Sequence, residues 1–193
     1  MVECLIGDPS AARQAARAAV REGASATAMA ATVLALGGDI SSARKAVAGL
    51  TDLNPGLMDG TQALVIGATA ALELAEGAPA KAVEALKVSL PFEPVVGHQN
   101  VYLRGEAYRA MGAWREAAAE FQKLTARPGL LGTSLVYPMA HLGLARALAR
   151  EDDTAGARAA YEKLFAIWKD ADPDLRPLVE ARREYAKLPA APR

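Results

Sequence analysis

One stretch of the sequence recurs five times with the same internal spacing, and this repetition restricts the fold more than any other feature. The copies are GDPSAARQAARAA at 7–19, GDISSARKAVAGL at 38–50, GAPAKAVEALKVS at 77–89, GAWREAAAEFQKL at 112–124 and DDTAGARAAYEKL at 152–164. Each copy begins with Gly, or with Asp152 in the last, and carries an Ala five residues later. A repeat of this length is typical of a solenoid, in which each unit buries its apolar face against the next.

The spacing inside each copy fits the second half of a helical hairpin. Gly adopts the left-handed conformation that ends a first helix, and the Asp or Pro after it starts a second helix. The Ala must be small because the two helices approach most closely there, and the residues four and seven positions later continue the buried stripe. These positions are Ala12/Ala16/Ala19, Ala43/Val47/Leu50, Ala82/Leu86/Ser89, Ala117/Phe121/Leu124 and Ala157/Tyr161/Leu164.

Composition also favours helices, because aromatic residues make up only 5% of the chain and alternating β-branched runs are scarce. We expect an all-α chain of about ten helices. The predicted elements are a lone second helix at 9–22, helix pairs at 24–36 with 40–52, 61–75 with 79–90, 98–111 with 114–126 and 137–150 with 154–169, and a last helix at 174–188. The sequence Asp172-Pro173-Asp174 marks the start of that last helix.

The best copy extends to VYLRGEAYRAMGAWREAAAEFQKL at 101–124 and resembles the tetratricopeptide repeat (TPR), a helical pair of 34 residues. The copies here lie 31, 39, 35 and 40 residues apart. The residues that match the TPR pattern are Gly105, Tyr108, Gly112, Ala117 and Phe121, with Pro55 at the proline position of the first full repeat. Val101 and Arg104 depart from the pattern, and an arginine at this buried position must either reach water or pair with an acid.

The resemblance implies a right-handed superhelical solenoid of antiparallel helix pairs that fills residues 1–193. Its divisions would be a half repeat at 7–22, repeats at 24–55, 61–91, 98–127 and 137–169, and a capping helix at 174–188. The capping helix carries a charged face, as the end of a solenoid requires. That face consists of Glu180, Arg182, Arg183, Glu184 and Lys187.

The N-terminal half repeat leads us to expect a fragment of a longer chain, because the turn Gly7-Asp8-Pro9 ends a helix that the sequence does not contain. Residues 7–188, and most specifically 98–188, resemble the C-terminal TPR region of bacterial multidomain signalling proteins. In such proteins a Ser/Thr protein kinase or a winged-helix DNA-binding domain precedes the repeats. No kinase motif occurs in this sequence, so catalysis would belong to the preceding domain.

Charge and hydropathy exclude several classes of protein. Basic and acidic residues each number 22, which disfavours binding to nucleic acid or to an anionic membrane. The longest uncharged run, 128–145, contains two prolines and three glycines and does not predict a membrane span. The lone Cys4 predicts no disulfide. We expect a location in the cytoplasm or in a soluble domain of a membrane-anchored protein.

The sequence offers little for catalysis, and we expect no enzyme, no metal site and no cofactor. Ser42 and Lys45 have the spacing of an acyl-serine enzyme, but its companion motifs are missing. His98 and His141 lie on different repeats without other ligands nearby. His141 falls where the TPR pattern has a buried Trp, so we interpret it as a hydrogen-bonded core histidine.

A protein or peptide partner is the remaining expectation, bound in the concave groove that the first helices line. The C-terminal half of this groove is aromatic and charged, with Tyr102, Glu106, Arg109, Leu142, Arg146 and Arg150. Its N-terminal half is small and mostly apolar, with Ser25, Ala28, Thr32, Ala35, Leu64, Ala71 and Leu74. This division predicts a ligand with an apolar stretch and an acidic end. The alternative is that Arg146 and Arg150 are ordinary solvated surface.

A second candidate surface is the uncharged loop GLLGTSLVYP at 129–138. Either Leu130, Leu135 and Tyr137 fold back onto the core of their own hairpin, or they form a contact site. Two functions therefore stay open. The first is a scaffold that docks a partner, and the second is self-association into a homodimer through the half repeat and this loop.

Overall fold

The computed structural model describes residues 9–20, 22–50, 60–90, 93, 98–131 and 134–189. These residues form helices and turns, and no β-strand occurs among them. The helices are α2 (Pro9–Ala19), α3 (Ala24–Leu36), α4 (Ile40–Ala48), α5 (Gly60–Ala75), α6 (Pro79–Lys87), α8 (His98–Ala110), α9 (Trp114–Thr125), α10 (Pro128–Leu131), α11 (Val136–Arg150), α12 (Thr154–Ile167) and α13 (Arg176–Lys187). The turn at Gly7 and Asp8, Cys4 and Pro55 lie outside the described residues.

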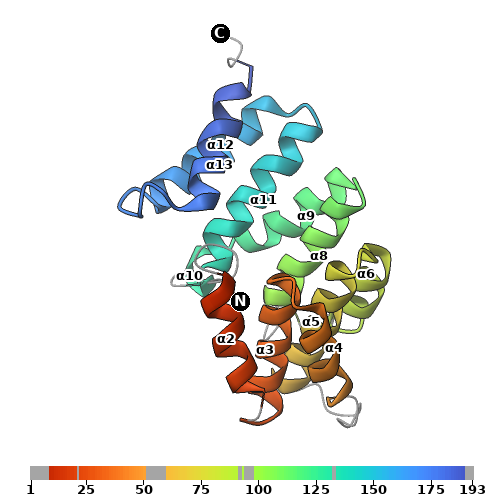
Figure 1. Ribbon diagram of the computed structural model, residues 1–193. Coiled ribbons are helices and arrows are strands. Elements are labelled where there is room, and N and C mark those ends of the chain that lie inside the picture. The colour runs from red at the N-terminus through yellow and green to blue at the C-terminus, as the bar shows by residue number, and fades with distance from the viewer. Residues whose placement is uncertain are drawn as a thin grey trace.

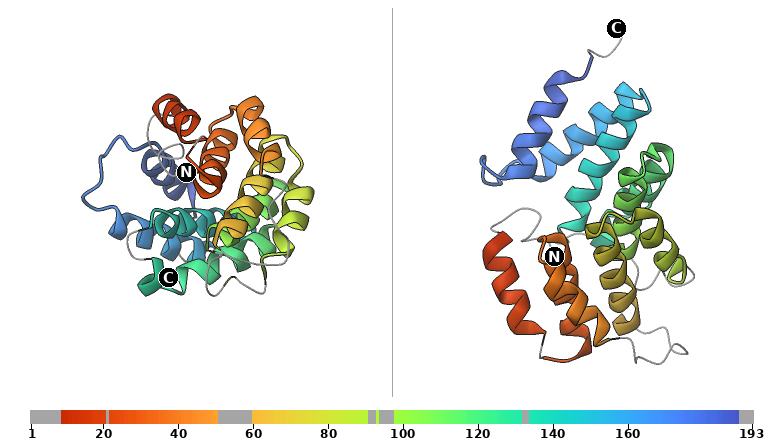
Figure 2. Two further views of the ribbon diagram at one scale, coloured as in Figure 1. Left: turned by 90° about the horizontal axis from the view of Figure 1, so that it is seen from below. Right: turned by 45° about the vertical axis from the view of Figure 1, so that its right-hand side comes forward.

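The helices pair as hairpins and stack into one curved array (Figure 1). The hairpins are α3 with α4, α5 with α6, α8 with α9, and α11 with α12. Successive first helices also contact one another, α3 against α5, α5 against α8, and α8 against α11. Figure 2 shows the pairs following a curved path, with α2 and α13 at opposite ends of the array. The all-α TPR-type solenoid predicted from the sequence is therefore confirmed.

The four hairpin turns share one geometry, as the repeated Gly predicted. Gly38, Gly77 and Gly112 have φ of 83°, 75° and 73°, and Asp152 takes the same left-handed conformation at 60°. The next residue in each turn donates its N–H to a carbonyl five residues back, at 2.8 to 3.0 Å. This bond satisfies a carbonyl that the end of the helix leaves unpaired. Asp39 and Asp153 then cap the second helices by accepting from the N–H groups of Ser42 and Gly156.

The repeated alanines lie where the hairpins pack most tightly. Ala43, Ala82, Ala117 and Ala157 are fully buried, and Ala12 is nearly so. The aromatic residues four positions later, Phe121 and Tyr161, are fully buried as well. The ring of Phe121 packs against the backbone of Gly105 in α8 and of Gly143 in α11, and so joins two consecutive repeats.

Arg104, which departs from the TPR pattern, is buried and paired with acids. Its side chain is only 3% exposed and binds the carboxylates of Glu93 and Glu120. The Glu120 oxygen lies 2.6 Å from a terminal guanidinium nitrogen of Arg104, and Lys123 binds the other Glu120 oxygen at 2.8 Å. Of the two outcomes expected for this arginine, pairing with an acid is the one that occurs.

The structure differs from the predicted helix boundaries at a few ends. The last helix begins at Arg176 and not at residue 174, because the Asp172 side chain accepts the N–H of Asp174 and holds a turn there. α2, α4 and α6 end three or four residues before their predicted ends. The short α10 lies in the segment that the sequence suggested to be a loop. No helix among the described residues is both long and apolar enough to cross a membrane.

Candidate interaction site

The C-terminal ends of α3 and α5 and the side of α8 enclose a recess of about 250 Å³. α3, α5 and α8 reach this point together because each packs against the next and each ends at an equivalent turn. The lining residues are Ala35, Leu36, Leu74, Ala75, Tyr102, Leu103, Glu106, Arg109 and Ala110. Most of this lining is aliphatic, so the recess suits an apolar group from a ligand.

Tyr102 forms part of the floor of the recess and is almost completely buried. Its ring packs against Phe121, with the ring centres 5.8 Å apart. Burial raises the pKa of the Tyr102 hydroxyl well above its usual range. The hydroxyl is therefore neutral at any physiological pH and can both donate and accept a hydrogen bond.

Glu106 and Arg109 supply the charges of the recess and pair with each other. The Arg109 guanidinium donates to one Glu106 oxygen from two nitrogens, at 3.0 and 2.7 Å. The negative charge of Glu106 is the main cause that raises the pKa of Arg109. Because both side chains stay partly exposed, each could exchange this bond for one to a ligand.

The other three residues predicted for the groove lie apart from this recess. Leu142 is buried in the core. The Arg146 guanidinium binds Glu184 of α13 at 2.8 Å and Glu180 at 3.1 Å. The guanidinium of Arg150 lies 4.8 Å from the ring centre of Trp114, a cation–π geometry. The capping helix thus supplies the acids for Arg146, and the recess contains Tyr102, Glu106 and Arg109 alone of the six.

Glu184 is the centre of this contact between α11 and α13. It accepts from Arg146 and also from the Tyr161 hydroxyl at 2.7 Å. Burial alone would raise the pKa of Glu184, but the hydrogen bonds from Arg146 and Tyr161 outweigh it and lower the pKa. Burial alone would lower the pKa of Arg146, but its hydrogen bonds to Glu184 and Glu180 and the negative charge of Glu184 together outweigh burial and raise the pKa. Both groups are therefore charged at neutral pH.

The N-terminal half of the predicted groove is closed by packing. Ala28, Thr32 and Ala71 are fully buried, so the expectation that they line an open groove is wrong. Their small side chains let α3 and α5 approach closely, and this approach covers the residues themselves. Ala35 and Leu74 do line the recess. Four further residues of the recess were not predicted. Leu36, Ala75 and Ala110 lie in the last turn of a predicted first helix, whereas Leu103 lies in the first half of α8.

The residues of the 129–138 loop that the structure describes pack inward. Tyr137 is buried and touches His141 edge-on, with ring centres 4.9 Å apart, and Leu135 packs against the same core. The side chain of Leu130 lies outside what the structure describes. The arrangement of Tyr137 and Leu135 fits the interpretation in which the loop folds onto its own hairpin.

His141 is buried as expected but is not hydrogen-bonded. Its side chain is 7% exposed, and neither ring nitrogen has a hydrogen-bond partner among the described residues. Burial, and to a smaller extent the charge of Lys163, lowers the pKa of His141 to about 4. The prediction of a hydrogen-bonded histidine is therefore wrong, and the ring contact that the structure shows for His141 is the edge of Tyr137. No cluster of His, Cys, Asp and Glu suited to a metal ion occurs in the described part of the chain.

Comparison with solved structures supports the fold. A structure described as a Podosopora anserina kinesin light chain with nearly identical TPR-like repeats aligns with a TM-score of 0.64 and 16% identity, over 83% of this chain and 82% of that one. No protein-family model and no curated protein sequence matches this chain. The chain is thus similar to TPR-like repeat proteins in its three-dimensional structure, which shows that its fold is a TPR-like solenoid.

Proposed function

We propose that this protein is a non-catalytic interaction module that binds a segment of another protein in the recess between α3, α5 and α8. The observation that carries the proposal is the composition of the recess, an aliphatic lining with one exchangeable ion pair and one buried tyrosine hydroxyl. Such a site receives an apolar side chain and fixes the neighbouring backbone by hydrogen bonds. The Glu106–Arg109 pair can meet either an N–H donor or a carboxylate.

Two further parts of the proposal rest on the sequence. The resemblance of residues 98–188 supports a docking or sensor region of a bacterial signalling protein, located in the cytoplasm or in a soluble part of a membrane-anchored chain. Self-association through the 129–138 loop is the alternative. Tyr137 and Leu135 of this loop are packed inward, so we favour binding of a separate partner in the recess.

The experiment is selection of peptides from a random library on the immobilised protein, followed by affinity measurement with defined variants. Leu74→Asp places a charge in the lining of the recess, and we expect it to weaken the selected peptides at least about tenfold. Val88→Asp is the matched control, because Val88 is 59% exposed and lies outside the recess. Peptides that bind both variants as well as the unchanged protein would contradict the proposed site.

A further inference from the structure

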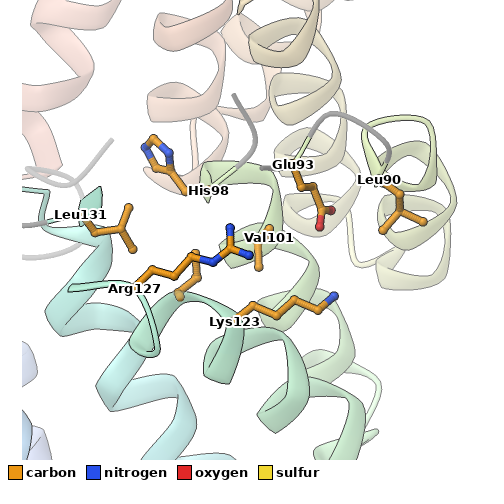
Figure 3. A pocket seen from close by; sticks show the side chains of 8 residues that line it. Leu90, Glu93, His98, Val101, Lys123, Arg127 and Leu131 are labelled. Carbon is orange, nitrogen blue, oxygen red and sulfur yellow. The ribbon is translucent and has the colours of Figure 1, made fainter. Parts of the chain in front are cut away.

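A second recess, of about 150 Å³, lies at the opposite end of the α8–α9 hairpin from its turn. Figure 3 shows its lining, which comes from the segment after α6, the start of α8, the end of α9 and α10. The floor is formed by Val101, Leu124 and Leu131, all of which are buried. Leu90 forms part of the wall and remains 44% exposed, so a ligand that covers it would bury further apolar surface.

Charged side chains surround this apolar floor, and their sum is positive. Arg104, Lys123 and Arg127 are the permanent cations in or next to the recess, and Glu93 and Glu120 are the acids. Arg104 uses both acids, and Lys123 shares Glu120 with it. No carboxylate lies within ion-pair distance of Arg127 in the described part of the chain. One positive charge therefore stays unbalanced at the site.

The position of Arg127 suits contact with a ligand. Figure 3 shows its side chain extending across the recess toward Val101, with His98 on the opposite wall. His98 is the first residue of α8, so the positive end of the dipole of this helix lies at the same wall. A single negative charge between Arg127 and the start of α8 would complete the local pairing.

We infer that this recess binds a monocarboxylate with a short aliphatic stem, the stem against Val101, Leu124 and Leu131 and the carboxylate against Arg127. The aliphatic floor favours an anion with an apolar stem over phosphate, because oxygens placed against Val101, Leu124 and Leu131 would lose water without gaining hydrogen-bond partners. The carboxylate comes either from a free short-chain acid or from the C-terminal Leu or Val of a polypeptide. This inference does not depend on the function proposed for the recess between α3, α5 and α8.

The test is calorimetric titration with four probes. They are 3-methylbutanoate, its neutral analogue 3-methylbutanol, a pentapeptide ending in Leu with a free carboxylate, and the same peptide as the amide. We expect each acid that binds to do so at least about tenfold more tightly than its neutral counterpart. Binding of 3-methylbutanoate supports a free acid as the source, and binding of the peptide alone supports a polypeptide C-terminus.

Variants locate the binding. Arg127→Gln should weaken the bound acid by about tenfold or more, because it removes the charge that has no internal partner. Arg183→Gln is the matched control, since Arg183 is an exposed arginine on α13 at the far end of the array. The inference is overturned if neither acid binds saturably, if the neutral analogues bind as tightly, or if Arg127→Gln and Arg183→Gln behave alike.

Discussion

The ring of Phe121 lies so close to the backbone of Gly143 that a β-carbon at Gly143 would come within 2.6 Å of it. Gly105 lies against the same ring, and a β-carbon there would come within 2.7 Å of it. Because Phe121 is fully buried between them, the ring cannot move away from either glycine. This contact fixes how close the α8–α9 and α11–α12 hairpins approach each other.

Gly143→Ala should therefore destabilise the protein although alanine favours helix. Overpacking lowers the free energy of unfolding by about 1–3 kcal/mol, and the higher helix propensity of alanine offsets about 1 kcal/mol of this loss. The measurement is urea denaturation followed by circular dichroism. Gly129→Ala is the control, because a β-carbon there meets no atom within 4 Å, and its midpoint should stay constant or rise. Equal midpoints for both variants would show that Phe121 can adjust.

Loss of the buried Arg104 should cost far more than loss of an exposed arginine. Arg104→Met leaves Glu93 and Glu120 without their shared cation, and we expect a loss of about 3–5 kcal/mol in the free energy of unfolding. Arg44→Met is the control, since the Arg44 side chain is 64% exposed in its pair with Glu76 and should contribute about 0–1 kcal/mol. Changing both glutamates to Gln in the Arg104→Met background should recover part of the loss. No recovery would show that Arg104 acts through its packing and not through its charge.

His141 should make the protein sensitive to mild acid. Its pKa is about 4 in the folded protein and near 6.5 when unfolded, so the unfolded chain binds a proton first. Stability from this group is complete above about pH 6.5 and falls as the pH drops toward about 4, by up to about 3 kcal/mol. Carboxylates such as Glu184 also contribute stability that the protein loses on acidification. The measured quantity is therefore the difference in unfolding free energy between the unchanged protein and His141→Gln. That difference should depend on pH, and a difference that stays constant between about pH 7 and about pH 5 would contradict this prediction.

The contact between α11 and α13 should depend on Glu184. Glu184→Ala removes the acceptor of the Tyr161 hydroxyl and one of the two acids that bind Arg146, and we expect a loss of about 1.5–3 kcal/mol in the free energy of unfolding. Glu162→Ala is the matched control, because Glu162 accepts one hydrogen bond, from the Tyr185 hydroxyl, at an exposed position. Thermal unfolding at two salt concentrations measures the loss of stability in Glu184→Ala and in Glu162→Ala. Equal losses would indicate that Glu184 is no better shielded from solvent than Glu162.

Sequence reasoning succeeded where one residue type answers one local requirement. The turn glycines could be predicted because the residue that ends each first helix must adopt the left-handed backbone conformation; they are Gly38, Gly77 and Gly112. The buried alanines followed from the same spacing. It failed where distant segments meet. The acids that bind Arg146 come from α13. Ala28 and Ala71 are buried because α3 and α5 pack closely against each other. A repeat pattern specifies each hairpin but does not state which groove positions its neighbours cover.

Photo-crosslinking shows whether a bound peptide lies in the recess between α3, α5 and α8. A photoreactive residue replaces Ala110, which lies at the edge of the recess between α3, α5 and α8, and in a second protein it replaces Ala80, which is exposed on α6. Each protein is irradiated with a library-selected peptide, and the products are mapped by mass spectrometry. The account predicts crosslinks from position 110 that disappear in Leu74→Asp, and few from position 80. Crosslinks that favour position 80, or that persist in Leu74→Asp, would contradict it.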